Sequence, residues 1–203
     1  MLEPVQLDVL TELINIGIGR ATSMLNQMVQ LDIRLDVPSI RILTAQELRQ
    51  EADAYGDDIF SIVRLGFEGC FHGTAQLVLP ATSATHLVAA VTGEEPDSPD
   101  VSALRGATLN EIGNILLNGV MGSLVNSLQG HLDFALPEYL EDTAPRTLVP
   151  GTSQNDEMVL FARARFATED GRIDGQLIVL FEAESTQTLI DSIDNITPDS
   201  MAG

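Results

Sequence analysis

The sequence predicts an α+β protein made of two pseudo-symmetric halves that share one sheet and one core. Three features favour this fold class: long amphipathic helical stretches, short segments of alternating apolar and polar residues, and an internal repeat. The chain has 203 residues, of which 44% are hydrophobic, so it can bury a substantial core. The repeat is the most informative feature, because it predicts that one arrangement of elements occurs twice.

The repeat is clearest in a short polar motif. Glu12 and Asn15 recur as Glu111 and Asn114, an offset of 99 residues (111 − 12). Further matches follow at offsets of 99 to 102: Leu10 with Leu109, Pro38 with Pro137, 76–79 with 176–179, 87–88 with 189–190, and Val91 with Ile193. We therefore expect a single domain at 1–203, with repeats at 1–93 and 101–203 and an acidic, proline-bearing linker at 94–100.

Each repeat is expected to have the order helix, strand, strand, strand, helix. In the first copy, apolar spacing predicts a long helix at 5–29, and alternation predicts a strand at 31–43 that Pro38 kinks or confines to an edge. Its remaining elements are strands at 59–66 and 73–80 and a helix at 81–92 that ends at Gly93.

The second copy repeats this order. Its expected elements are a helix at 101–128, strands from about 132, at 157–167 and at 174–181 with a turn at Gly171 between the last two, and a helix at 184–194. Each half alone is small for independent stability. We therefore expect the two half-sheets to join under a single core.

Composition excludes several classes of function. A net charge of −20 disfavours nucleic acid and anionic membranes as partners. All ten basic residues are arginine, which excludes lysine Schiff bases and lysine-bearing phosphate loops. Cys70 is the single cysteine, and the three histidines lack metal-site spacing. The start of the chain lacks the features of a secretory signal, and no apolar run reaches the ~18 residues of a membrane helix, so we expect a cytoplasmic protein without membrane insertion.

The repeated motif is the strongest candidate for a functional site. Asp8, Glu12 and Asn15 lie at i, i+4 and i+7, which places them on one face of the expected helix, and Glu111 and Asn114 repeat the arrangement. Such residues on a polar helix face are usually only solvated. However, asparagine is a mediocre helix former, so its recurrence at both equivalent positions favours a function.

The pattern Asp/Ser-x3-Glu-x2-Asn-x22-Pro resembles the signature of the CheC/CheX/FliY phosphatases of bacterial chemotaxis. The first copy fits it at every position: Asp8, Glu12, Asn15 and Pro38. The second copy fits as Glu111, Asn114 and Pro137, with Ala107 where Asp or Ser is expected. Two signatures in a chain of about this length resemble CheC, whereas CheX has one signature and pairs with itself.

The resemblance implies a hydrolase that removes the aspartyl phosphate of a CheY-type response regulator. Asn15 and Asn114 would each orient the attacking water, and Glu12 and Glu111 would each pair with a lysine of the regulator. Asp8, Pro38 and Pro137 would support the geometry of the two sites. The regulator would supply the Mg²⁺, so we expect this chain to bind no metal or cofactor of its own.

Two alternatives remain open. The same fold could serve as a non-catalytic module that binds a phosphorylated regulator or a flagellar switch component, as in the middle domain of FliM. That domain lacks the Glu/Asn pairs, and no motor-binding domain is expected after the last helix, which ends close to Gly203. The chain could instead mainly sequester the deamidase CheD, a partner that the resemblance allows but that no sequence feature tests.

Two departures from the family pattern, and a set of helix glycines, bear on the sites. Ala107 removes a polar contact from the second site, which is expected to weaken or alter it. Arg20 could either attract the phosphoryl group or obstruct entry to the first site. Several glycines interrupt the two long helices and indicate either close helix packing or room for a partner's loop: Gly17, Gly19, Gly113, Gly119 and Gly122.

Overall fold

A computed structural model describes residues 3–29, 31–149 and 158–196 of the chain. The first half contains α1 (Pro4–Val29), β1 (Ile33–Leu35), β2 (Ser39–Thr44), α2 (Ala45–Asp53), β3 (Ile59–Gly69), β4 (Gly73–Pro80) and α3 (Ala81–Thr92). The second half contains α4 (Pro99–Ser127), β5 (Leu132–Phe134), β6 (Glu138–Thr143), α5 (Ala144–Leu148), β7 (Met158–Thr168), β8 (Asp174–Phe181) and α6 (Ala183–Ile196). The order of elements is therefore the same in both halves.

Within the described residues, eight strands form one antiparallel sheet in the order β1-β7-β8-β4-β3-β5, with β2 also pairing with β7 and β6 with β3. Each half thus adds its two short strands to the hairpin of the other half. If each strand is replaced by its equivalent in the other half, the same strand order is read from the opposite edge of the sheet. A pseudo-two-fold axis therefore lies between β4 and β8. The predicted α+β fold, with two half-sheets joined into one, is confirmed.

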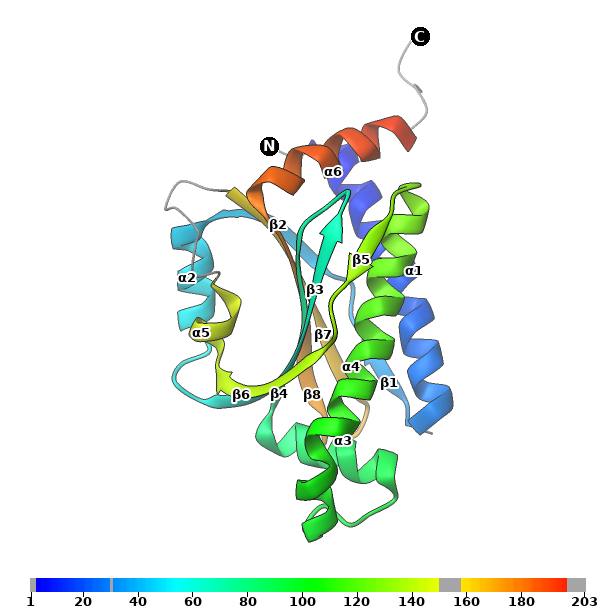
Figure 1. Ribbon diagram of the computed structural model, residues 1–203, viewed down its shortest axis with the longest axis vertical. Helices are drawn as coiled ribbons and strands as arrows, with labels where there is room; N and C mark the ends of the chain where they lie inside the picture. The colour runs from blue at the N-terminus through cyan, green and yellow to red at the C-terminus, as the bar shows by residue number, and fades with distance from the viewer. Residues whose placement is uncertain (1–2, 30, 150–157, 197–203) are drawn as a thin grey trace.

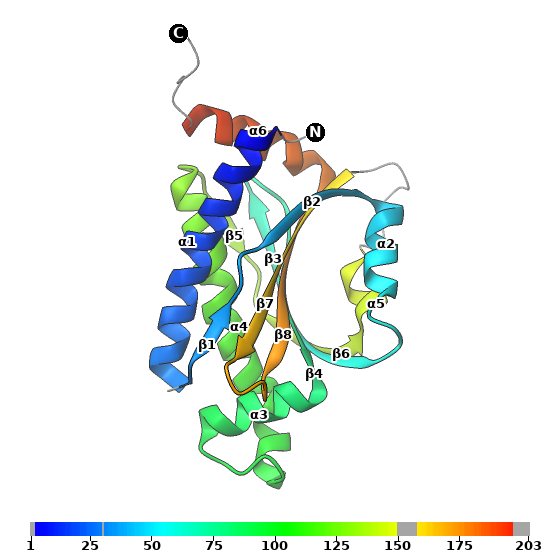
Figure 2. The ribbon, with the colours of Figure 1, turned by 180° about the vertical axis from the view of Figure 1, so that it is seen from behind.

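The helices cover both faces of this sheet. Helices α1 and α4 lie side by side along one face, with α3 near one end and α6 crossing the other end (Figure 1). Figure 2 shows α2 and α5 on the opposite side of the sheet. The main core lies under α1 and α4 and draws on both halves, for example Leu10, Leu116 and Phe166. A smaller apolar cluster lies under α2 and α5 and includes Leu48 and Leu148.

The structure corrects the expected strand at 31–43. It contains two strands, β1 and β2, separated by a bend that ends at Pro38. Proline has no N–H to donate to a ladder, and both short strands pair with the same neighbour, β7, on either side of this interruption. The second copy has the same break at Pro137, between β5 and β6.

The short helices α2 and α5 are absent from the sequence prediction. Thr44 and Glu47 form a capping box at the start of α2: the Glu47 N–H donates to the Thr44 side chain (3.2 Å), and the Thr44 N–H donates to the Glu47 carboxylate (2.7 Å). This Thr-x-x-Glu pattern was therefore an available signal. Helix α4 begins at Pro99, inside the segment expected as a linker, because the Ser98 side chain caps it.

Candidate functional site

Three motif residues of α1 form a stripe on the helix face that points away from the core. Asp8 and Glu12 are exposed and Asn15 is half-buried, whereas Leu10 and Ile14 face the sheet and are buried. The spacing of i, i+4 and i+7 brings the three side chains onto one face, as the sequence predicts. A carboxylate and a carboxamide therefore lie within one turn of each other at the surface of α1.

Helix α4 carries the equivalent stripe. Glu111 is exposed and Asn114 is half-buried, while Leu109 and Ile112 on the other side of the helix are buried. Ala107 is also exposed, so the missing Asp or Ser of the second copy leaves a gap in the surface rather than in the core. The predicted residues of both copies thus occupy equivalent helix faces.

Glycine residues allow α1 and α4 to approach closely, and their position shows which way the stripes face. A Cβ on Gly17 would lie 2.8 Å from a backbone oxygen of α4, and a Cβ on Gly119 would lie 2.9 Å from a side-chain carbon of α1. At about 100° per residue, Asn15 lies about 160° around α1 from Gly17, and Asn114 about 140° around α4 from Gly119. The two stripes therefore face outward, each away from the other helix.

The remaining glycines of the two helices differ in their surroundings. A Cβ on Gly113 would lie 2.4 Å from the Cγ1 of Val63 on β3, whereas Gly19 and Gly122 have nothing within 4 Å of an added Cβ. Close packing accounts for Gly113, as it does for the glycines between α1 and α4. It does not account for Gly19 or Gly122.

The motif prolines lie in the bends that divide the short strands. Pro38 is buried and Pro137 is half-buried. Where the first bend begins, Leu35 and Asp36 line a groove together with Gly19 of α1. The first bend therefore lies beside the helical turn that follows the Asp8–Glu12–Asn15 stripe.

The two asparagines have different partners. The Nδ2 of Asn118 donates a hydrogen bond to the Oδ1 of Asn114, one helical turn earlier. Asn15 makes no such bond within the described residues, and the position equivalent to Asn118 is Gly19. Asn118 lies outside the signature and was not among the predicted site residues. Comparing the two copies at the offset of 99 is the signal that could have found it.

Arg20 lies on the seam between the helices rather than on the stripe of α1. Its Nη1 donates to the Oγ of Ser123 on α4 at 3.3 Å. On a helix, residue 20 lies about 140° around from residue 15. The guanidinium is therefore held on the side of α1 that faces α4, away from the carboxamide of Asn15.

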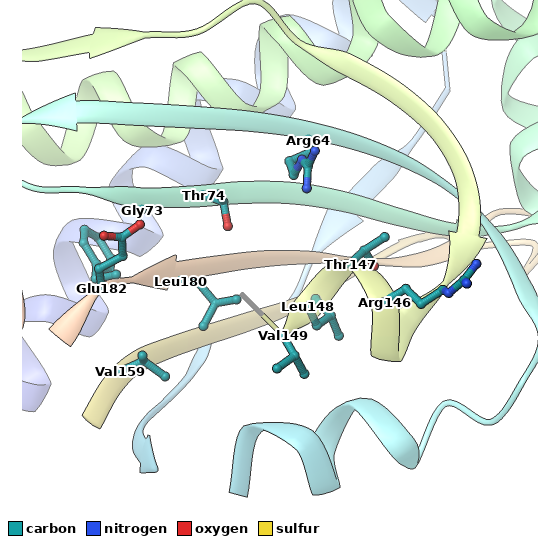
Figure 3. A pocket seen from close by; sticks show the side chains of 11 residues that line it. Arg64, Gly73, Thr74, Arg146, Thr147, Leu148, Val149, Val159, Leu180 and Glu182 are labelled. Carbon is teal, nitrogen blue, oxygen red and sulfur yellow. The ribbon is translucent and has the colours of Figure 1, made fainter. Parts of the chain in front are cut away.

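The motif side chains lie on exposed helix surfaces and not in the pocket drawn in Figure 3. That pocket has a volume of about 200 Å³ and lies on the other face of the sheet, where Arg64, Thr74, Arg146 and Leu180 are among its lining residues (Figure 3). Across the described ranges, no three His, Cys, Asp or Glu side chains are grouped so that they could hold a metal ion. The two stripes therefore lie on the open surface of the helices rather than in an enclosed pocket.

Comparisons with known proteins agree with this architecture, although no family model matches the chain. The chain is 28% identical over 138 residues to the CheY-P phosphatase CheC of Bacillus subtilis, a match that covers 66% of this chain and 65% of that protein. Its structure is similar to FliY of Thermotoga maritima, with a TM-score of 0.77, 17% identity and coverage of 97% and 100% of the two chains. The chain is CheC-like, with the fold of the CheC/CheX/FliY family.

Other solved structures share this fold. A Borrelia burgdorferi CheX, solved in complex with CheY, BeF₃ and Mg²⁺, matches with a TM-score of 0.53 and 18% identity over 83% of this chain and 96% of that one. Middle domains of FliM also share the fold. At these identities the structural likeness establishes the fold alone. In the described part of the CheC-like chain, no helix is both long and apolar enough to cross a membrane.

Proposed function

We propose that this chain dephosphorylates a CheY-type response regulator by hydrolysing its aspartyl phosphate. The observation that carries the proposal is the pair of outward-facing stripes, each with an exposed Glu and a half-buried Asn one turn apart: Glu12 with Asn15 and Glu111 with Asn114. The relationship to the CheY-P phosphatase CheC supports the choice of substrate. Asp8, Pro38 and Pro137 are proposed to support the geometry of the two sites.

The role of each Asn is to position water. Phosphoryl transfer needs an in-line nucleophile more than it needs a strong base. A carboxamide can accept a hydrogen bond from the water through Oδ1 while its N–H groups face the anionic phosphoryl oxygens. The water oxygen then bonds to phosphorus, the bond from phosphorus to the aspartyl oxygen breaks, the aspartate leaves as a carboxylate, and both water hydrogens stay with inorganic phosphate. A carboxylate at this position would instead repel the phosphoryl group.

The role of each Glu is to anchor the helix on its partner. Glu12 and Glu111 are exposed, and neither forms an ion pair with an arginine within the described ranges, so both carboxylates are free to meet a cation. A charge-assisted hydrogen bond to a lysine beside the phosphate would fix the helix in register one turn from the Asn. The regulator supplies that lysine, the phosphoaspartate and the Mg²⁺.

The direct test is phosphate release from a phosphorylated response regulator. Wild type is compared with Asn15→Ala, Asn114→Ala and the double variant, with Asn126→Ala as a matched control because Asn126 is an exposed asparagine of α4 outside the stripe. We expect each single variant to lose the contribution of one site and the double variant to fall to the rate of the regulator alone. Asn126→Ala should hydrolyse as fast as wild type.

A double variant that hydrolyses as fast as wild type would overturn the roles assigned to the asparagines. If wild type binds the phosphorylated regulator without accelerating phosphate release, the chain is a binding module and not an enzyme. A binding titration with CheD in place of the regulator tests whether a deamidase partner binds this chain.

A further inference from the structure

The two stripes differ in the helical turn that follows Asn15 and Asn114. The first stripe continues from Asn15 to Gly19, whereas the second continues from Asn114 to Asn118. At the other end the difference is reversed, because Asp8 is matched by Ala107. Each stripe therefore has one small residue, and the two small residues lie at opposite ends of the motif.

The hydrogen bond from Asn118 leaves the chemistry of Asn114 available. The Nδ2 of Asn118 donates to one lone pair of the Oδ1 of Asn114, since both side chains lie on the same face one turn apart. The second lone pair of Oδ1 and both N–H groups of Asn114 are not used by this bond. The bond therefore restrains the carboxamide without occupying the groups that water and phosphate need.

Asn15 has no equivalent restraint. Gly19 has no side chain, and a Cβ at that position would meet nothing within 4 Å. The Asn15 carboxamide forms no hydrogen bond within the described residues and can rotate about its side-chain torsions. Its orientation must then be fixed during hydrolysis on the bound regulator, and the side-chain entropy that this costs falls on the chemical step.

We propose that Asn118 is a positioning residue that pre-orients Asn114 for catalysis, so that the two sites differ in how far they are organised before the regulator arrives. This inference rests on the proposed phosphatase function. The entropy cost of immobilising one side chain corresponds to a factor of about three to ten, by which kcat is lower when the Asn is unrestrained. The second site should therefore hydrolyse phosphate faster with the Asn118 hydrogen bond than without it. This holds even though Ala107 lacks the polar side chain found at Asp8.

The test isolates each site and exchanges the residue that follows its Asn. In an Asn15→Ala background, Asn118→Ala should lower the kcat of the second site about three- to tenfold while KM changes less than about twofold. In an Asn114→Ala background, Gly19→Asn should raise the kcat of the first site by a similar factor. A rise in rate cannot come from damaged folding, and a Cβ at residue 19 would meet nothing within 4 Å.

A second readout does not depend on activity. In the free wild-type protein, NMR relaxation of the side-chain amides should show Asn114 more ordered than Asn15, and Asn118→Ala should remove the difference. Equal mobility of the two amides would overturn the proposal. An unchanged or increased kcat in Asn118→Ala would also overturn it. So would an inactive Asn15→Ala protein beside an active wild type, because the second site would then contribute no hydrolysis. A wild type that never accelerates hydrolysis would instead refute the phosphatase function itself, and the amide measurement would still report on the restraint.

Discussion

Leu77 and Leu177 lie directly opposite each other where β4 pairs with β8. They are equivalent positions of the two sequence repeats, at an offset of 100 residues (177 − 77). Their neighbours are exchanged accordingly, with Gln76 opposite Ile178 and Val78 opposite Gln176. The pseudo-two-fold axis of the molecule therefore passes between the two leucines, through the centre of the sheet.

The two glutamines beside this axis link each half to the small helix region of the other. The Nε2 of Gln76 donates to the carbonyl of Thr147 in α5 at 3.1 Å, and the hydroxyl of Tyr55, just after α2, donates to the Oε1 of Gln176. Because each half also completes the sheet of the other, we expect the halves to unfold together as one cooperative unit.

The glycines of α1 give a matched pair of stability predictions. Gly17→Ala should lower the free energy of unfolding by about 1–3 kcal/mol, because its Cβ would press on the backbone of α4. Gly19→Ala should raise it by up to about 1 kcal/mol, because alanine favours the helix and the site is open. Urea denaturation of both variants measures the difference. Equal effects would show that the two helices do not pack through Gly17.

Arg20 is predicted to matter little for hydrolysis at the first site. Its guanidinium bonds to Ser123 on the seam between α1 and α4, away from Asn15. Arg20→Gln in an Asn114→Ala background should therefore change kcat/KM by less than about threefold, within the range of an exposed polar contact. Phosphate release measures this directly. A tenfold loss would indicate that the side chain swings toward the phosphoryl group, and a tenfold gain that it obstructs entry.

The two tyrosines of the chain predict a pH dependence at the alkaline end. Burial raises the pKa of Tyr55 above its ordinary value of 10.0, and burial together with the hydrogen bond to Glu141 raises the pKa of Tyr139. The native state therefore holds both protons more tightly than the unfolded state. Stability from this source is complete below pH 10 and is lost as the pH rises through the native pKa values.

Near-ultraviolet absorbance of the phenolate tests this prediction. The native protein should titrate at higher pH than the same protein in denaturant, and Tyr55→Phe and Tyr139→Phe should each remove one of the two delayed transitions. A native titration that coincides with the denatured one would contradict the burial of both hydroxyls.

The sequence by itself determined the repeat, the order of the long helices and long strands, and the outward face of each motif. These follow from short-range periodicity: the spacing of Asp8, Glu12 and Asn15 selects one helix face whatever surrounds it. Gly93 ends α3 in a left-handed conformation (φ 74°), and Gly171 also has a positive φ (70°) between β7 and β8. Local chemistry was sufficient for these positions.

Only the tertiary structure decided how the halves exchange strands and which glycines lie between α1 and α4. Strand pairing such as that of β1 with β7 joins residues 33–35 to 166–168, and no local pattern specifies such a distant partner. Likewise, Gly17 and Gly19 look alike in sequence, but only Gly17 meets a neighbouring helix.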